Sequence, residues 1–550
     1  MTLFLIEKIK ALKFKDCLSN LGSNWFIPLS AVFFLLTNTG MPNANGLPFE
    51  FYWSIIPSVL LIFVISAVFP SFAAFMSRTK VKLRVIALLS SVGICYGLFD
   101  ILKDVPYAWG GNTFVLRLIF LILGIPFVFA VNLIFWNKFE SLIVDIISES
   151  DITKPEWIIY TILFLIFCAF VSLFFLSSQA FYGTEHDLDI IYSSDSPELL
   201  KYNAYIALDH VENDVRQPLF AVFSAPLMGI PCLIGNLMPF VPEALILDFA
   251  QIMLLFFTAL ILACELRLSM IQRICFMLVA SSTYTFLLFS LMMEQYIIAF
   301  YWLVLTIRCM NRDRKEALKF SYAASGTLLI SGILVPFIVK PEKKGFELVF
   351  EWVKRLLIYG FDFLLMLLMA GRFNLILNAL DNLAVLSLFT GKTIGYFERL
   401  LQYLNFVGGC FIAPASEAAV VKNTYVGWHL SEVTAVSLTG IIIIALAIAG
   451  FIVTVRSKIS RFALGWICLS LFVLIVIGWG IYENGLILYA LYFGWPFYVL
   501  IFNLLKSIED KIKTRFIIPA VSAVLILLFL INNIPAVMDL LDFAVRAYPA

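Results

Sequence analysis

Long apolar runs constrain the fold of this chain more than any other feature. A run of about 18 apolar residues can cross a bilayer as a helix, and 62% of all residues are hydrophobic whereas 14% are charged. That balance is typical of a chain surrounded by lipid. We therefore predict an all-α polytopic membrane protein with about 12–14 transmembrane helices, near residues 26–40, 52–77, 84–102, 113–136, 157–177, 243–266, 273–292, 295–308, 317–340, 356–371, 431–455, 461–481, 485–505 and 515–535.

Basic residues in short loops predict the orientation. The positive-inside rule places loops rich in Lys and Arg in the cytoplasm, and such loops occur around residues 78–84, 308–319, 456–461 and 506–515. Together with the lysines of the first segment, they predict a multi-pass protein of the plasma (inner) membrane with a cytoplasmic N-terminus. The same orientation places two large segments, 178–242 and 373–430, on the outer side.

Interruptions of the apolar runs predict irregular elements. Glycines and a proline predict a broken hairpin over 317–340, and the alternation of apolar and charged residues predicts an interfacial helix over 346–357. In the first outer segment, apolar residues at helical spacing predict a surface helix over 197–213. The run 219–242 contains several prolines, so we expect it to be re-entrant or to lie in the outer leaflet.

The distribution of charged residues predicts a functional division at residue 156. Residues 1–156 form a group of N-terminal transmembrane helices whose charged residues indicate no chemistry. Residues 157–550 contain both outer segments and every candidate site residue. The role of residues 1–156 is left open.

Composition also excludes some partners. The net charge of +1 provides no basic stripe for nucleic acid, and three histidines cannot form a His-rich metal site. The nine cysteines are scattered and form no CxxC motif. We therefore expect no nucleic-acid partner and no zinc or thiol redox site.

The stretch GTEHDLDIIYSSDSPELL, residues 183–200, gathers five carboxylates in the first outer segment. At a membrane boundary, a carboxylate can act as a general base on a sugar hydroxyl or bind a divalent cation that neutralises a phosphate. Asp187, Asp189 and Asp195 are the catalytic candidates, and Glu198 is a candidate for substrate binding. The spacing of Asp195 and Glu198 is also typical of a helix-capping box, and a solvated acidic loop is the simplest alternative.

The residues around this stretch resemble a known superfamily. An acidic pair after a transmembrane helix is followed by DSPELLKYNAYIAL and then by VRQPLFAVFSAP. This order is similar to the first outer loop of the GT-C glycosyltransferases, which include protein mannosyltransferases and the aminoarabinose transferases of lipid A. Weaker similarity extends to MMEQYIIAFYWLVLTIRCMNRDRKEALKFSYAASGTLL and IYENGLILYALYFGWPFYVL, so the resemblance covers about residues 157–510.

The resemblance implies a GT-C-like fold, a polyprenyl-phosphate sugar donor and a loop aspartate that acts as catalytic base. The matching base here is Asp195, or else Asp187 or Asp189, and RQPLF at 216–220 is similar to a family motif close to HPPL or RHPLF. In simpler members the acidic loop follows the first transmembrane helix, whereas four helices precede it here. The paired acids of HDLD match either the base or a metal position, so the cofactor, including a divalent cation, stays unknown.

Other residues are candidates for binding the donor or the acceptor. A guanidinium pairs bidentately with phosphate oxygens, which favours Arg216 and Arg372. Glu294 and Glu483 stand at outer boundaries of apolar runs, where an acid is costly to bury. His429 stands where the second outer segment re-enters the membrane, and each of these residues also has an ordinary alternative as an interfacial anchor or a solvated turn residue.

These features predict an enzyme. We expect a membrane glycosyltransferase that transfers a sugar, with inversion, from a lipid-linked donor to a glycan, lipid or protein acceptor on the outer side, in contact with membrane lipids. One alternative is a lipid or glycan transporter or flippase, which would place charges at the midplane between symmetric halves. A polysaccharide polymerase is another, although such proteins typically carry Arg-rich outer loops.

Overall fold

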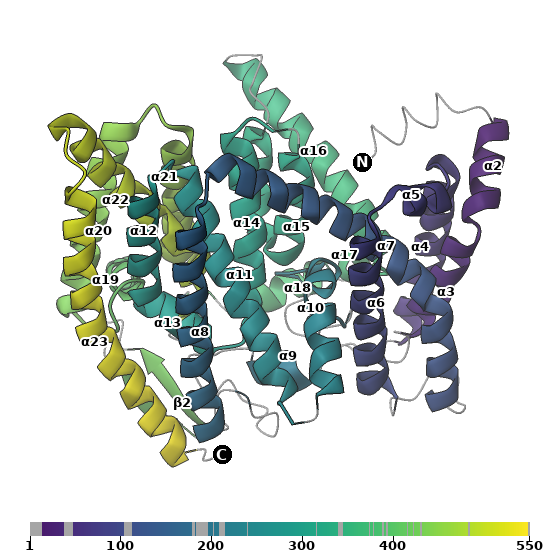
Figure 1. The fold of residues 1–550 in the computed structure, drawn as a ribbon, viewed down its shortest axis with the longest axis horizontal. Coiled ribbons are helices and arrows are strands. Elements are labelled where there is room, and N and C mark those ends of the chain that lie inside the picture. Colours follow the sequence, from purple (N-terminus) through teal and green to yellow (C-terminus); the bar gives the residue numbers. More distant parts are fainter. Residues whose placement is uncertain are drawn as a thin grey trace. The chain divides into compact units, whose positions relative to one another are not determined.

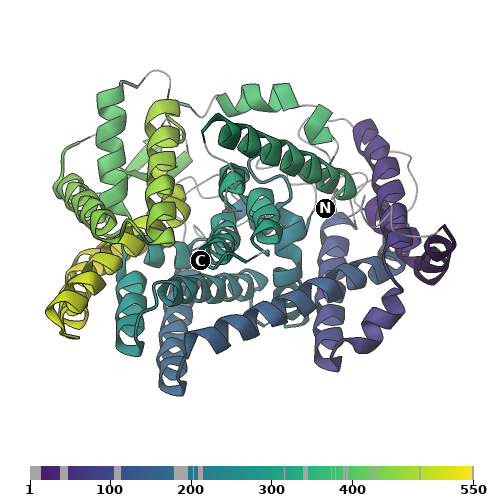
Figure 2. The same cartoon turned by 90° about the horizontal axis from the view of Figure 1, so that it is seen from above.

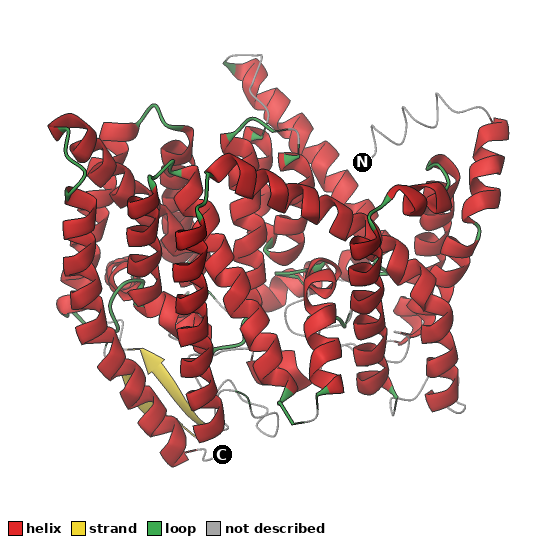
Figure 3. Cartoon of the chain, viewed as in Figure 1, coloured by secondary structure: helices red, strands yellow, loops and turns green. Residues whose placement is uncertain are grey.

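The computed structural model is almost entirely helical in the part of the chain that it describes (Figures 1 and 3). Among these residues, nine helices are long and apolar enough to cross a membrane. The number of candidate spans rises to as many as 12 if each of three bent helix pairs is counted as one span. The chain is therefore an all-α polytopic membrane protein, as predicted. The described residues are 14–37, 48–103, 113–178, 182, 196–201, 203–207, 215–238, 240–314, 316–338, 345–372, 374–377, 379–387, 390–391, 394–414, 416–421, 423–428, 432–481 and 485–547.

The contacts of the chain divide it into two compact units. Unit 1 contains Met1–Ile146, Tyr202–Leu247 and Ser321–Asn382, and unit 2 contains Ile147–Lys201, Asp248–Phe320 and Leu383–Ala550. The functional division predicted at residue 156 stays a prediction, because these units follow packing and not chemistry. Four helices contribute residues to both units, namely α7 (Thr113–Ser150), α11 (Glu243–Glu265), α15 (Ala317–Thr327) and α18 (Ala379–Leu386).

Unit 1 consists of helices from three stretches of the chain. Within it, α4 packs against α2 and α3, α6 packs against α10, and α16 packs against α4 and η1. The predicted break within 317–340 is present, because α15 ends at Thr327 and a 3₁₀ helix follows after the extended residue Leu328. The remaining elements of this unit are α2 (Phe14–Asn24), α3 (Phe26–Thr37), α4 (Pro48–Val68), α5 (Phe72–Arg78), α6 (Val81–Leu102), α10 (Phe220–Leu237), η1 (Leu329–Phe337), α16 (Phe346–Met369) and α17 (Asn374–Leu377).

Helix α10 corrects the expectation that prolines break residues 219–242. It is a single helix that continues through Pro226 and Pro231, and it is long and apolar enough to span a membrane. Its placement as a re-entrant or outer-leaflet segment stays a prediction. Ser90 on α6 donates a 3.1 Å hydrogen bond to the Pro226 carbonyl. Proline is tolerated in a membrane helix that packs against neighbouring helices, and this hydrogen bond shows that α6 lies beside Pro226. The sequence of α10 alone does not reveal that neighbour.

Two glycines allow α6 and α10 to approach closely. A Cβ on Gly93 would overlap the carbonyl of Gly229, and a Cβ on Gly229 would overlap the carbonyl of Ser90. Small residues at a helix contact permit this kind of backbone proximity in membranes. The two helices therefore pack with their backbones in direct contact at these glycines.

Two other helix predictions are wrong in extent. Residues 346–357 do not form a separate interfacial helix, because α16 runs continuously to Met369. The predicted surface helix over 197–213 ends at Lys201. Residues 203–207 then form buried turns, starting at Asn203, whose φ of 40° lies in the left-handed region that asparagine tolerates.

Unit 2 contains the long helices of the C-terminal half. In this unit, α20 packs between α19 and α22, and α23 packs against α12. In the view from above, the yellow ribbon of α23 lies beside α12 (Figure 2). An antiparallel hairpin of two strands is the one sheet among the described residues. The elements that lie wholly in unit 2 are α8 (Lys154–Ser177), α9 (Ser196–Lys201), α12 (Met270–Ser282), α13 (Tyr284–Leu291), α14 (Gln295–Asn311), α19 (Tyr396–Gly409), β1 (Ser416–Val421), β2 (Asn423–Trp428), α20 (Ala435–Thr454), α21 (Lys458–Leu471), η3 (Phe472–Ile477), η4 (Gly485–Tyr489), α22 (Ala490–Ile512) and α23 (Ile517–Ala547).

Candidate functional site

Residues 183–195, which we call the acidic segment, are flanked by two residues that are fixed by hydrogen bonds. Residues 183–195, which include the predicted catalytic residues Asp187, Asp189 and Asp195, lie outside the described residues. The residues on either side, Tyr182 and Ser196, are described, and both are buried in unit 2. The candidate site is therefore built from these two anchors and the groups that they contact.

The anchors contact a break between two helices. Helix α13 ends at Leu291 and α14 begins at Gln295, and both Met292 and Glu294 have extended backbone conformations. Such a break leaves carbonyl groups without their intrahelical partners, and buried carbonyls must find other donors. The side chains of Tyr182, Ser196 and Gln251 supply those donors.

Tyr182 connects the start of the acidic segment to this break. Its hydroxyl donates to the Leu291 carbonyl at 2.8 Å and to Oδ2 of Asp248 at 2.9 Å. Asp248, on α11, is completely buried, and a buried carboxyl is costly unless a hydrogen bond compensates it. The single phenol proton is therefore shared between two buried acceptors. Burial together with Asp248 raises the pKa of Tyr182 well above its usual value.

Ser196 connects the other end of the segment to the same break. Its hydroxyl donates to the Met293 carbonyl at 2.8 Å. The next residue, Glu294, is completely buried, and Gln251 on α11 holds its backbone through two contacts. The Gln251 amide accepts from the Glu294 N–H at 3.3 Å and donates to the Glu294 carbonyl at 2.9 Å.

The sequence predicts one member of this cluster but not the others. Glu294 is a candidate because it stands between two apolar runs. Asp248 and Gln251 were missed, although both interrupt the run EALILDFAQIMLL with a spacing of three residues, which places them on one helix face. That spacing is the signal that could have found them.

In unit 1, both predicted phosphate-binding arginines adjoin one apolar cluster. The Arg216 carbonyl accepts a 2.9 Å hydrogen bond from the N–H of Leu329, and three residues later the N–H of Leu219 donates to Gly326. Arg372 follows the end of α16 and is buried, and its N–H donates to the Leu367 carbonyl. Both leucines, Leu219 and Leu367, pack in the cluster, which consists of Leu219, Tyr322, Val335, Tyr359, Phe363 and Leu367.

Polar groups at this cluster were not predicted from the sequence. The Tyr322 hydroxyl donates to the buried carboxylate of Asp362 at 2.6 Å. The Tyr322 and Tyr359 rings stack with centroids 4.5 Å apart, and the Tyr359 hydroxyl donates to Ser325 Oγ at 2.8 Å. An acid and two phenols thus lie in an otherwise apolar environment, in the same unit as Arg216 and Arg372.

The other predicted site residues stay predictions. His429 and Glu483 lie outside the described residues, and so does the side chain of Glu198, whose backbone is part of α9. Within the described part of the chain, no group of three or more His, Cys, Asp or Glu side chains could hold a metal ion. Residues 183–195 lie outside that part of the chain, and a divalent cation at the acidic segment stays a prediction.

Comparisons with protein-family models, with curated proteins and with solved structures found no match for this chain.

Proposed function

We propose that this protein is a membrane glycosyltransferase that transfers a sugar from a polyprenyl-phosphate donor to an acceptor hydroxyl of a glycan, lipid or protein. The reaction takes place on the outer side of the plasma (inner) membrane, and the N-terminus is cytoplasmic. The observation that carries the proposal is the attachment of both ends of the acidic segment, through Tyr182 and Ser196, to the break beside buried Glu294. A general base needs this kind of fixed support, and the resemblance of the segment to the GT-C superfamily points to the same chemistry.

In the proposed reaction, one aspartate of the acidic segment (Asp195, Asp187 or Asp189) accepts the proton of the acceptor hydroxyl. The hydroxyl oxygen bonds to the anomeric carbon as the bond between that carbon and the donor phosphate breaks. The phosphate leaves with the bonding electrons, and this direct displacement inverts the anomeric carbon. Arg216 and Arg372 are proposed to stabilise the leaving phosphate, because guanidinium groups can pair bidentately with its oxygens.

Individual Asp→Asn substitutions test the proposal. Asp195→Asn, Asp187→Asn and Asp189→Asn each remove a base while preserving the shape of the side chain. We expect at least one of them to reduce transfer of radiolabelled sugar from a panel of polyprenyl-phosphate donors by about 10²-fold or more, because general-base catalysis contributes factors of that size. Membrane vesicles that contain equal amounts of each variant provide the measurement.

Asp381→Asn is the matched control. Asp381 is exposed on α18, within the other predicted outer segment, and undergoes the same change of charge. Its variant should retain full transfer activity. Full activity in all three loop variants would disprove the assignment of the base.

The buried carboxyl of Asp248 favours one alternative function, a transporter or flippase. A carboxyl inside a candidate membrane span is typical of ion-coupled transporters. For a transporter or flippase, Asp248→Asn would stop the movement of a lipid-linked sugar across the membrane, and the wild-type protein would form no transfer product. Detection of a covalently transferred sugar with the wild-type protein favours the glycosyltransferase.

A further inference from the structure

A charged pocket lies in unit 2 where two helices end and a third begins. Its volume is ≈ 570 Å³, which is within the usual range for small-ligand sites. The ends of α11 and α14, the start of α21 and one side of α22 form its wall. Four of its lining residues are cationic and two are acidic, namely Arg267, Arg312, Lys458 and Lys506, and Glu265 and Asp313.

The two helix ends adopt the same unusual backbone conformation at the pocket. Arg267 follows α11 with φ 51°, and Asp313 follows α14 with φ 54°. Glycine is the usual residue in this left-handed conformation, because a Cβ strains it. Side chains that occupy such positions are often found at functional sites, and here both side chains line the pocket.

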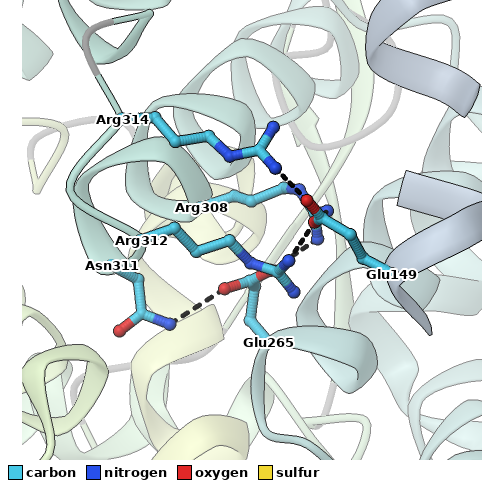
Figure 4. A network of polar contacts seen from close by, with 6 residues as sticks. All are labelled: Glu149, Glu265, Arg308, Asn311, Arg312 and Arg314. Atoms are coloured by element: carbon cyan, nitrogen blue, oxygen red, sulfur yellow. Dashed lines mark hydrogen bonds and ion pairs between the residues drawn. The ribbon is translucent and has the colours of Figure 1, made fainter. Parts of the chain in front are cut away.

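A network of ion pairs holds the acidic side of the pocket (Figure 4). Glu265 accepts from Arg308 at 2.5 Å and from Arg312 at 2.8 Å. Glu149, at the end of α7, contacts both of these arginines and also Arg314. Three guanidinium groups thus surround two carboxylates, and Arg308 is completely buried among them.

The remaining cations leave the pocket with an excess of positive charge. Lys506 is held by the carbonyls of Leu266 and Arg267, each 2.9 Å from its Nζ. Lys458 pairs with Asp313 at the protein surface. In the described part of the chain, the exposed guanidinium of Arg267 has no hydrogen-bond or ion-pair partner. Cations near helix ends satisfy carbonyl groups and the positive-inside rule, but neither role requires a cavity.

We propose that this pocket binds a phosphate group, with Arg267 and Lys458 as direct contacts and Arg312 and Lys506 as fixed charges behind them. Guanidinium and ammonium groups form short, charge-assisted hydrogen bonds with phosphate oxygens. The phosphate belongs either to an anionic phospholipid headgroup or to a water-soluble phosphorylated compound. The basic loops around the pocket predict that it faces the cytoplasm, so this site is independent of the proposed sugar transfer on the outer side.

Titration calorimetry on the full-length protein in a neutral detergent tests the proposal. The soluble probes are inorganic phosphate and glycerol 3-phosphate, and the lipid probe is phosphatidylglycerol in mixed micelles, with phosphatidylcholine micelles as reference. The test variant is R267Q/K458Q. R267Q alone serves as a second variant, because the Arg267 side chain is exposed and makes no hydrogen bond or ion pair within the described part of the chain. The matched control is K511Q/R515Q, which removes two exposed charges that do not line the pocket.

We expect the wild-type protein to bind at least one probe, and R267Q/K458Q to bind it at least about tenfold more weakly, because this variant loses both charge-assisted contacts. R267Q should show an intermediate loss, and K511Q/R515Q none. Binding of the soluble probes identifies a water-soluble ligand, whereas binding of phosphatidylglycerol alone identifies a lipid headgroup. The proposal is overturned if the wild-type protein binds no probe, or if the control variant loses as much affinity as R267Q/K458Q.

Discussion

The phenol group of Tyr182 fixes the position of the residue that precedes the acidic segment. Tyr182 is the first described residue before that segment, and its hydroxyl contacts groups on α11 and at the end of α13. Its removal would leave the buried carboxyl of Asp248 without a described hydrogen-bond donor. An unsatisfied buried group of this kind costs about 1–3 kcal/mol.

We therefore predict that Tyr182→Phe lowers the free energy of unfolding by about 1–3 kcal/mol and weakens sugar transfer. The double variant Tyr182→Phe/Asp248→Leu should be less destabilised than the sum of its single variants, because it removes both members of the contact. Chemical unfolding followed by tryptophan fluorescence measures all four proteins. Strictly additive effects would contradict the contact.

The same hydroxyl predicts a dependence on alkaline pH. The pKa of Tyr182 is raised in the folded protein, so above about pH 10 the unfolded chain loses this proton while the folded chain keeps it. The contribution of Tyr182 to stability is complete below that pH and is lost as the pH rises toward the folded-state pKa, by up to about 1.4 kcal/mol per pH unit. The Tyr182→Phe variant should show a correspondingly shallower decline, and an identical slope in both proteins would exclude this assignment.

Among the residues of the candidate site, the sequence identifies those whose type is unusual for their position in the chain. Glu294 stands out between two apolar runs and is buried in the candidate site. Asp248 becomes meaningful only beside Tyr182, which lies 66 positions away in the chain. The partner of a buried polar group is a tertiary property, so residue type and spacing cannot supply it.

Helix α10 is the element that differs most from its prediction. Two prolines indicate an interruption, yet the helix is continuous where it packs along α6. Hydrophobic runs predict most of the other long helices, because their length and composition are local properties. Continuity through proline, and the fusion of two predicted elements in α16, depend on neighbours that a local pattern does not contain.

The contact between α6 and α10 predicts a strong effect for a single methyl group. Gly229→Ala should destabilise the protein by about 1–3 kcal/mol, because its Cβ overlaps backbone atoms of α6. Gly465→Ala, within α21, is the control, since among the described residues no heavy atom beyond its own helical turns lies within 4 Å of the added Cβ. That variant should be neutral or more stable by up to about 1 kcal/mol. Thermal unfolding of both proteins in one detergent makes the comparison, and equal shifts would refute the close approach.

At the scale of the whole molecule, the orientation in the membrane is a prediction from charge. The basic loops favour one side, and the acidic segment is then on the other. A cysteine introduced as Ser193→Cys should react with a membrane-impermeant maleimide in intact cells. Glu316→Cys, in a basic loop, should react only after the membrane is opened. Labelling in the reverse order would place the acidic segment in the cytoplasm.

The unmodified protein is the control for this labelling. All nine native cysteines are free in the structure, and Cys468 is exposed on α21, which is part of a candidate span. Lipid around a membrane span excludes a charged reagent, and a thiol reacts as its thiolate. Background labelling of the unmodified protein should therefore be low in intact cells.

The sequence by itself determined that this chain is a polytopic membrane protein and where most of its long helices lie. The reason is physical: in lipid every backbone polar group must be satisfied within its own helix, so a spanning segment is visible in a local run of residues. The tertiary structure alone decided that α10 is continuous and that Tyr182, Asp248, Gln251 and Glu294 meet at the ends of the acidic segment. Those outcomes depend on contacts between distant parts of the chain, whose energies of about 1 kcal/mol each arise only when the partners are packed together.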